Sequence, residues 1–228
     1  MTSRKAVFID IDNTIIHGTT VNILVKFSYK NGYIPITIIP KAFFWYFLYK
    51  MNYIKDFSGI VQKTSVLLED ILKNIPAKEI NKIFKQCFEK EIKPMIYSES
   101  VQMLNEFNKK GFEIFFISST FEPLATLIRD HIGFGSVIAT KLEEKDGYYT
   151  GKIKGKVCYG VEKLLKIEEV TKERQLNLKD SYAFSDHISD IPMLQKVGHP
   201  VVVNPCSQLN KTAKKNKWEI RNFKFNKL

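Results

Sequence analysis

The sequence is poor in cysteine, which excludes two classes of small, cross-linked protein. The 228 residues contain three cysteines, Cys87, Cys158 and Cys206, and none of them forms a CxxC pair. An odd number of isolated cysteines indicates neither a disulfide framework nor a zinc site. A reducing compartment suits such a chain best, so we expect a cytoplasmic location.

Long apolar runs are also missing. The most apolar stretch, 34–54, is interrupted by two prolines and two lysines, and its longest part without a charge is 42–49. A membrane-spanning helix needs roughly 20 consecutive apolar residues. The first five residues lead directly into a short apolar run and have none of the features of a signal peptide. We therefore expect no membrane-spanning segment and no leader.

What is present is an alternation of short apolar runs with helical patterns. The apolar runs lie at 6–9, 112–117, 137–139, 181–184 and 201–203, and the helical patterns lie at 100–110, 124–132, 161–170 and 191–197. Continuous apolar runs are typical of strands that are buried on both faces of a parallel sheet. The alternation predicts an α/β fold with a doubly wound, mainly parallel sheet.

Two segments interrupt this alternation. The stretch 17–93 contains helical patterns, including 57–72 and 77–91, and no convincing strand. We therefore predict an inserted α-helical cap domain at 17–93 and a core domain formed by 1–16 and 94–228. The second interruption is Asp146-Gly147, whose turn chemistry predicts a β-hairpin between Leu142 and Ile153.

Polar side chains follow three of the predicted strands at the point where each strand ends. They are Asp10, Asp12, Ser118, Ser119, Asp186 and Asp190. In a doubly wound sheet, ligands bind at the carboxyl ends of the strands. Two carboxylates at one strand end repel each other, and they are stable together only beside a cation or hydrogen-bond donors. Lys163, near the start of a helix, opposes the helix dipole unless an anion lies nearby.

Each of these residues also has an ordinary structural explanation. The first two aspartates could belong to a solvated turn, and Lys163 could simply be a solvated lysine. Ser118 could cap a helix, and Asp190 could cap the helix predicted at 191–197. Four separate explanations would then be needed, whereas one shared site explains every feature.

The order of these residues resembles that of the haloacid dehalogenase superfamily, in its phosphoserine-phosphatase-like branch (subfamily IB). The motifs that carry the resemblance are Asp10-Ile-Asp12-Asn-Thr14, the Ser118 step, the hairpin 147–151, Ser185-Asp186-His-Ile-Ser-Asp190-Ile-Pro-Met-Leu, and 197–205. The resemblance covers nearly all of the chain outside the predicted cap. Two departures are Asn13 and Ser185, where the family usually has glycine. Asparagine tolerates left-handed backbone conformations better than most residues do, so the first departure is mild.

The resemblance implies a Mg²⁺-dependent phosphomonoesterase that forms an aspartyl-phosphate. The roles that it assigns are nucleophile for Asp10, general acid and base for Asp12, phosphate binding and charge stabilisation for Ser118 and Lys163, phosphate binding for Ser119, and support for Thr14 and Asp190. The Mg²⁺ ion, which prefers oxygen ligands, would be held by Asp10, Asp186 and the carbonyl of Asp12.

The identity of the substrate stays open at this level. A small phosphorylated metabolite such as phosphoserine is the first expectation. An aromatic run at 43–49 and a basic segment at 204–228 favour a second one, a lipid phosphate at a membrane surface. A phosphotransferase would share the same intermediate, and a non-catalytic binding protein could keep the fold. Lys63, Glu69 and Asp70 of the predicted cap could select a substrate, but the sequence assigns none of them.

The chain is basic overall, with a net charge of +11. Segment 204–228 contributes +6 of this charge, from seven basic residues and one acid. A solvated helix explains such a segment, and we expect no nucleic-acid partner. Peripheral membrane contact stays open. Moderate basicity also suits an enzyme that attracts phosphorylated anions.

Overall fold

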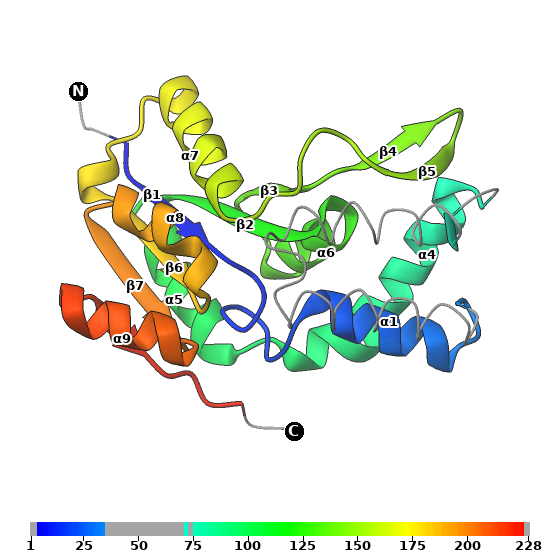
Figure 1. The fold of residues 1–228 in the computed structure, drawn as a ribbon, viewed down its shortest axis with the longest axis horizontal. Helices are drawn as coiled ribbons and strands as arrows, with labels where there is room; N and C mark the ends of the chain where they lie inside the picture. The colour runs from blue at the N-terminus through cyan, green and yellow to red at the C-terminus, as the bar shows by residue number, and fades with distance from the viewer. Residues whose placement is uncertain (1–3, 35–70, 73–74, 226–228) are drawn as a thin grey trace, which may run out of the picture.

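The computed structural model describes residues 4–34, 71–72 and 75–225 (Figure 1). The aromatic run at 43–49, the cap candidates Lys63, Glu69 and Asp70, and most of the helix predicted at 57–72 lie outside the described residues. The N-terminal strand starts at the far side of the sheet from helices α1 (Thr20–Lys30) and α4 (Ala77–Cys87) of the predicted cap (Figure 1).

A parallel sheet of six strands forms the centre of the core. Its strands are β1 (Ala6–Ile9), β2 (Glu113–Phe121), β3 (Ser136–Thr140), β6 (Tyr182–Ser185), β7 (His199–Val203) and β8 (Glu219–Arg221), in the order β3-β2-β1-β6-β7-β8. Every neighbouring pair is parallel. The predicted fold class is therefore confirmed. The connections run outward in both directions from the β1–β6 pair, so a topological switch point lies between these strands.

Helices cover both faces of this sheet. Val7 and Ile9 of β1 pack in a cluster with α5 (Ser98–Lys109) and α6 (Glu122–Ile132). Phe8, on the other face, packs in a second cluster with α7 (Val161–Arg174), α8 (Ile191–Lys196) and α9 (Ser207–Asn216). Because both faces of β1 are covered, all four of its residues are buried, as the continuous apolar run predicts.

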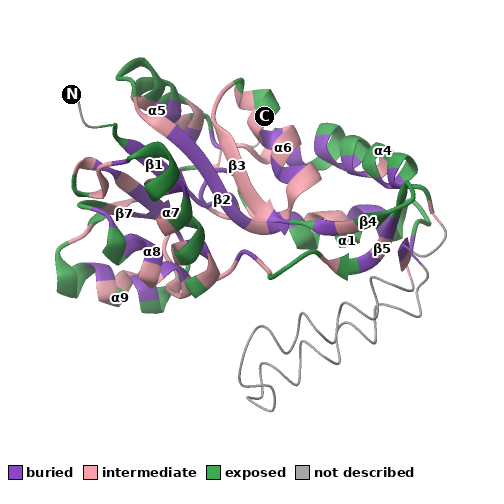
Figure 2. Cartoon of the chain, turned by 90° about the horizontal axis from the view of Figure 1, so that it is seen from above, coloured by how far each residue is buried: buried purple, intermediate pink, exposed green. Residues whose placement is uncertain are grey.

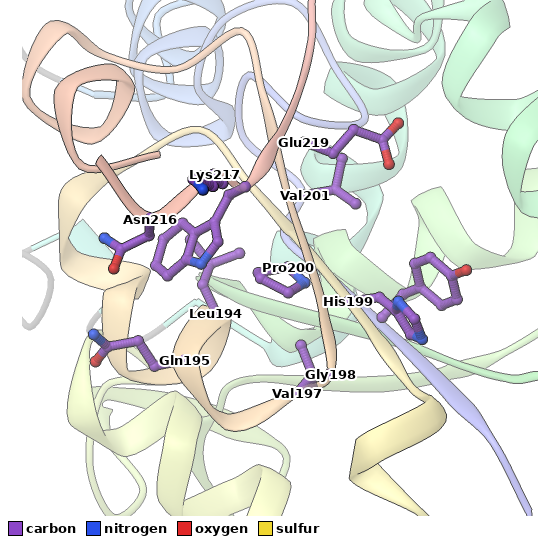
Figure 3. A pocket seen from close by; sticks show the side chains of 12 residues that line it. Leu194, Gln195, Val197, Gly198, His199, Pro200, Val201, Asn216, Lys217 and Glu219 are labelled. Carbon is purple, nitrogen blue, oxygen red and sulfur yellow. The ribbon is translucent and has the colours of Figure 1, made fainter. Parts of the chain in front are cut away.

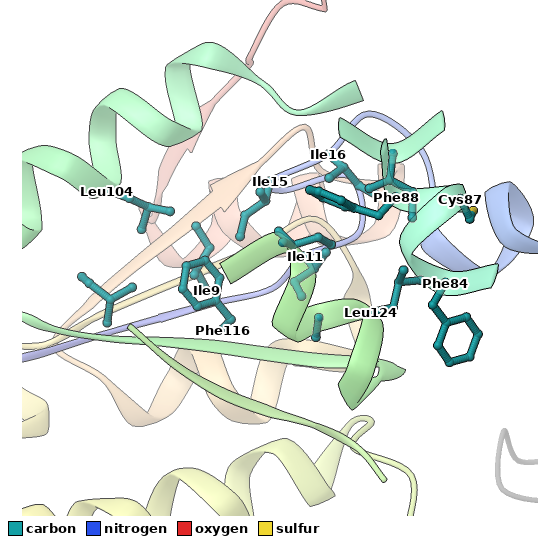
Figure 4. Packing of buried hydrophobic residues seen from close by; sticks show 14 of the residues in the cluster. Ile9, Ile11, Ile15, Ile16, Phe84, Cys87, Phe88, Leu104, Phe116 and Leu124 are labelled. Atoms are coloured by element: carbon teal, nitrogen blue, oxygen red, sulfur yellow. The ribbon is translucent and has the colours of Figure 1, made fainter. Parts of the chain in front are cut away.

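The described part of the predicted cap is helical and shares its apolar core with the sheet. It contains α1 (Thr20–Lys30), α4 (Ala77–Cys87) and the π-helical turn η1 (Phe88–Ile92), and the short 3₁₀ turn η2 (Lys93–Met95) begins at its last residue. Buried side chains of α4 and η1 pack in one cluster with Ile9 and Leu124 (Figure 4). Figure 2 shows buried residues in purple alternating with exposed ones in green along α4. Phe84 of α4 also stacks on Phe121, with 6.2 Å between ring centroids.

The chain enters and leaves this helical region through two adjacent segments. Ile16 and Ile96 form an antiparallel bridge, and the amide of His17 donates to the carbonyl of Met95 at 2.7 Å. The amide of Tyr97 donates in turn to the carbonyl of Ile15. The division into a cap at 17–93 and a core stays a prediction, but these paired crossings lie at its proposed borders.

The predicted hairpin forms a separate two-stranded sheet, β4 (Leu142–Lys145) and β5 (Tyr148–Ile153). Its turn residues Asp146 and Gly147 both have positive φ, 52° and 80°, which suits the tight turn. The Gly147 carbonyl accepts from the amide of Ala77, and the Tyr149 hydroxyl bonds to Asn81 Oδ1 at 3.0 Å. The hairpin therefore contacts α4.

Several elements differ from the sequence-based predictions. Strand β2 continues through an irregular pairing between Ser118 and Phe121, whereas the apolar run predicted an end at residue 117. The helix predicted at 77–91 changes to π-helical geometry at Phe88. The basic C-terminal segment contains α9, with Leu209 and Ala213 buried, and a strand that the sequence did not predict, β8. Within the described residues, no helix has the length and apolar character needed to span a membrane.

Candidate active site

The carboxyl ends of β1 and β6 bring two buried aspartates to the switch point. Ile9 pairs with Phe184, and the amide of Asp10 donates to the Phe184 carbonyl at 3.0 Å. Asp10 follows β1 directly and Asp186 follows β6 directly, and these two residues are only 6% and 8% exposed. The pairing of the two strands thus places residues that are 176 positions apart in sequence at one edge of the sheet.

A buried lysine joins two acids at this edge. Lys163, which is 3% exposed, donates from Nζ to Asp10 Oδ1 and to Asp190 Oδ2, both at 2.7 Å. Lys163 lies in the first turn of α7. This helix begins directly after Gly160, whose φ is 56°. A cation at the positive end of a helix is unfavourable by itself, as the sequence indicated. The two carboxylates offset this repulsion.

Asp190 is held by two serines as well as by the lysine. Ser185 Oγ donates to Asp190 Oδ2 at 2.7 Å, and Ser189 Oγ donates to Asp190 Oδ1 at 3.3 Å. Asp190 precedes α8, yet its side chain makes no capping hydrogen bond to that helix. Its carboxylate is directed to Lys163, in place of the helix-capping role that the sequence left open.

Burial and contact with a group of opposite charge have opposite effects on the pKa values in this network. Burial alone would lower the pKa of Lys163, but the charges of Asp10 and Asp190 outweigh it and raise that pKa, so the lysine stays protonated. Burial raises the pKa of Asp10, and repulsion from Asp190, Asp12 and Asp186 adds to the rise, whereas Lys163 opposes it. A cation beside Asp10 therefore favours the ionised carboxylate that a nucleophile requires.

Asp12 contacts the beginning of helix α1. Its Oδ1 accepts the amide of Thr20 at 2.8 Å. The backbone turns immediately after Asp12, because Asn13 adopts a left-handed conformation with φ of 52°. Burial raises the pKa of Asp12, and the Thr20 amide opposes the rise. A raised pKa favours the protonated form of the carboxyl group, which is the form that a general acid uses.

The two serines predicted to bind phosphate lie in the irregular end of β2, beside β1. Ser118 is fully buried, and its Oγ accepts the amide of Thr120 at 3.2 Å, so the hydroxyl proton is still available for an anion. Ser119 is fixed through its carbonyl, which accepts from Thr140 Oγ1 at 2.8 Å. Thr14 Oγ1 is buried without a hydrogen-bond partner among the described residues.

Sequence reasoning did not assign a role to several residues that contact these side chains. Asn13 Nδ2 donates to Asp186 Oδ2 at 3.1 Å, and Asn204 Nδ2 donates to the Asn13 carbonyl at 3.3 Å. Ser185 and Thr20 contact Asp190 and Asp12 as described above. For Asn13 and Ser185, the sequence did offer a signal, because each replaces a glycine that is usual at its position in the family.

The donors in this site fit a hard divalent cation. Asp10 and Asp186 offer carboxylate oxygens and Asp12 offers a carbonyl, and Mg²⁺ commonly takes few protein oxygens together with phosphate and water. Among residues 4–34, 71–72 and 75–225, no group of three or more His, Cys, Asp or Glu side chains is arranged to hold a metal. The predicted ligand set contains only two such side chains, Asp10 and Asp186, because its third donor is the main-chain carbonyl of Asp12.

An open pocket of about 560 Å³ lies elsewhere, at the amino ends of β6 and β7 (Figure 3). Its lining includes Gly198, His199, Lys217 and Trp218. Because the sheet is parallel, this pocket lies at the edge opposite the carboxyl ends that carry Asp10 and Asp186. The buried ionisable groups mark the other edge as the candidate active site.

The strand order, the acids at the switch point and the buried lysine define a doubly wound α/β protein with a buried ionisable site. The model of the haloacid dehalogenase-like hydrolase family matches residues 7–195. The chain belongs to this family.

Relatives with assigned names support the same class. A phosphoserine phosphatase of Mycobacterium tuberculosis is 26% identical over 229 residues, covering 96% of this chain and 71% of the relative. A histidinol-phosphatase of Neisseria meningitidis is 31% identical over 151 residues, covering 64% and 68%. A solved structure of a protein of unknown function from Bordetella pertussis has a TM-score of 0.85 at 21% identity, covering 96% and 99%. The predicted enzyme class, a phosphatase, is confirmed by the family and these names.

Proposed function

We propose that this protein is a Mg²⁺-dependent phosphomonoesterase that forms an aspartyl-phosphate on Asp10. The observation that carries the proposal is the contact of Asp10 Oδ1 with Lys163 Nζ at 2.7 Å, at the sheet edge that also carries Asp186. A phosphate monoester is an anion, so its attack by a carboxylate requires neighbouring positive charge and fixed geometry.

In the first step, an oxygen of Asp10 attacks phosphorus and the bond to the ester oxygen breaks. The leaving oxygen takes a proton from Asp12, whose raised pKa suits a general acid. Lys163 and Ser118 hold the non-bridging oxygens and stabilise the charge that develops on them. When bound by Asp10, Asp186 and the Asp12 carbonyl, Mg²⁺ supplies further neutralisation of the phosphoryl charge.

In the second step, Asp12 is a carboxylate and acts as a general base. It takes a proton from a water molecule, the water oxygen attacks phosphorus, and the bond to Asp10 breaks. Inorganic phosphate leaves and both aspartates return to their starting states. Asp190 keeps Lys163 in place throughout, because it contacts the same ammonium group at 2.7 Å.

The nucleophile is tested by Asp10→Asn. We expect hydrolysis of p-nitrophenyl phosphate to fall by at least about a thousandfold, the scale of removing a catalytic nucleophile. Asp130→Asn, at an exposed aspartate on α6, is the matched control and should keep full activity. Wild-type enzyme treated with ³²P-labelled substrate should carry a label that hydroxylamine removes, and Asp10→Asn should carry none. Near-normal turnover by Asp10→Asn would remove Asp10 from this role.

The metal is tested by chelation. Activity should disappear in EDTA and return when Mg²⁺ is added in excess. Full activity after exhaustive chelation would contradict the metal assignment while leaving the nucleophile in place.

A small phosphorylated metabolite, such as phosphoserine, is the proposed substrate class. The support comes from the relatives named phosphoserine phosphatase and histidinol-phosphatase, whose names already differ in substrate. Assays on a panel of phosphorylated metabolites and lipids would identify the substrate. Sedimentation with anionic liposomes tests the second candidate, a lipid phosphatase at a membrane surface, which the basic C-terminal segment favours. The cytoplasmic location stays a prediction.

A further inference from the structure

Asn13 occupies a position that the family usually gives to glycine, and both polar atoms of its side chain form hydrogen bonds. Its φ of 52° lies in the left-handed region, which asparagine and glycine both tolerate. Its Oδ1 accepts the amide of Gly18 at 3.1 Å, and its Nδ2 donates to Asp186 Oδ2 at 3.1 Å. The backbone of this turn thus permits glycine, while the amide group adds a contact that glycine cannot make.

Asn13 connects the loops that follow three strands, through its side-chain amide and its main-chain carbonyl. Asn13 lies after β1, its partner Asp186 lies after β6, and Asn204, which donates to its carbonyl at 3.3 Å, lies after β7. Asn204 is also left-handed, with φ of 44°, and its own Oδ1 accepts the amide of Phe223 at 2.9 Å. The contact with Asn204 holds the backbone of Asn13, so the side-chain amide of Asn13 is presented to Asp186 from a fixed position.

A neutral donor is well suited to this position. The site already gathers several carboxylates around one lysine, so a second cation at Asp186 would compete with a bound metal ion. An amide hydrogen bond fixes one carboxylate oxygen without adding charge, and it leaves the other oxygen free to bind an ion. Partners of this kind orient metal ligands, and their loss typically weakens metal binding about 10- to 100-fold.

We propose that Asn13 is a positioning residue that orients the Asp186 carboxylate for Mg²⁺ through its side-chain amide. The inference rests on the proposed function, since it takes Asp186 as a metal ligand. It concerns metal affinity and leaves the chemical step to Asp10 and Asp12.

The test is Asn13→Gly, which keeps the left-handed turn and removes the side-chain amide together with its hydrogen bonds to Asp186 and Gly18. Isothermal titration with Mg²⁺, without substrate, should show binding weaker by about 10- to 100-fold. The matched control is Gln175→Gly, at another left-handed position (φ 55°) that ends helix α7. It should bind Mg²⁺ as the wild type does. Circular dichroism checks that both variants are folded.

Activity gives a second readout. At saturating Mg²⁺, kcat of Asn13→Gly should lie within about twofold of wild type, while the Mg²⁺ concentration for half-maximal activity rises with the measured Kd. Equal Mg²⁺ affinity in wild type and Asn13→Gly would overturn the inference and leave the proposed function intact. Equal weakening in Gln175→Gly would overturn it as well, because the effect would then be a general one. A wild type that binds no Mg²⁺ would overturn the inference together with the metal assignment of the proposed function, and would leave the test of Asp10 as nucleophile separate.

Discussion

The ionisable residues of this site differ in the charge of the groups that they contact. Lys163 contacts Asp10 and Asp190 in the protein interior, and Asp186 is held by an uncharged amide. Burial raises the pKa of the Asp186 carboxyl from its usual 3.8 to about 7, against the hydrogen bond from Asn13. Without a divalent cation, ionised Asp186 therefore destabilises the folded protein, since an unfolded chain ionises this group more readily.

The sign of this effect predicts how stability depends on pH. In EDTA, the free energy of unfolding should fall as pH rises from about 4 to about 7, because Asp186 ionises more easily in the unfolded chain. The raised pKa values of Asp10 and Asp12 act in the same direction. Urea unfolding at pH 5 and at pH 7.5 would measure the change. Asp186→Asn should reduce the fall, and an unchanged fall in that variant would contradict the prediction.

The thiols give a second prediction at this scale. Burial raises the pKa of both Cys87 and Cys158 to about 12, so almost none of either thiol is ionised at pH 8. Cys206 is partly exposed. Iodoacetamide applied to native protein at pH 8 should add one label, at Cys206, and labelling in urea should add three. Rapid native labelling of Cys158, detected by peptide mass spectrometry, would contradict this assignment.

Among the secondary-structure elements, those with a strong local signal were predictable. The apolar run 6–9 became β1, and Asp146-Gly147 became the turn of the hairpin, because burial and turn chemistry are local properties. Strand β8 was not predictable, since its three residues are Glu219, Ile220 and Arg221 and only pairing with β7 makes them a strand. The polar end of β2 was missed for the same reason: pairing with β3 keeps it extended.

The same distinction applies to the candidate site. The acids and Lys163 could be selected because they follow predicted strands or begin a predicted helix, and one shared site explains all of them. Their mutual contacts depend on the pairing of distant strands, and sequence spacing does not give it. Asn13 and Asn204 illustrate the limit, because an asparagine in a turn has an ordinary local role, and its long-range hydrogen bond becomes visible only in the fold.

The tail after β8 contacts both segments that join the predicted cap to the core. Phe225 stacks on His17 with 4.6 Å between ring centroids, and Phe223 packs edge-on against Tyr97. The amide of Lys224 donates to Glu99 Oε2 at 3.0 Å. This tail therefore fixes the crossings near residues 15–17 and 95–97, where the backbone bonds of both segments lie.

Removing one ring from this contact should loosen the crossings. We expect Phe225→Ala to lower the free energy of unfolding by about 1 kcal/mol, the usual value of an aromatic pair. It should also speed hydrogen exchange at the amides of His17 and Tyr97. Lys224→Ala is the control, because its contact with Glu99 uses the backbone amide and survives the substitution. Unchanged exchange in Phe225→Ala would show that the stacking does not restrain these segments.

At the scale of the whole molecule, one apolar cluster connects the described cap helices with the core sheet. Phe84 and Phe88 belong to the same cluster as Ile9, Phe116 and Leu124 (Figure 4). The hairpin β4–β5 adds a polar contact to the same helix through Tyr149. Shared burial of this kind favours joint unfolding of the connected parts.

We therefore expect α4 and β1 to unfold together. Hydrogen exchange under increasing urea should give the slowest amides of both elements the same opening free energy. Phe84→Ala, which creates a cavity in the shared cluster, should lower both values by about 3–5 kcal/mol. Lys85→Ala, on the exposed face of α4, should leave them within about 0.5 kcal/mol. Loss of protection in α4 alone would show two independent units.

The central place of β1 in the sheet has a consequence for biosynthesis. This strand leaves the ribosome before both of its pairing partners, residues 113–116 and 182–184. At a translation rate of roughly 5–20 residues per second, β1 must wait about ten seconds or longer for its second partner. During that time its apolar residues are available to chaperones or to other nascent chains. The sheet can close around β1 only when synthesis has passed β6, so β1 stays unpaired on one side until that strand is made.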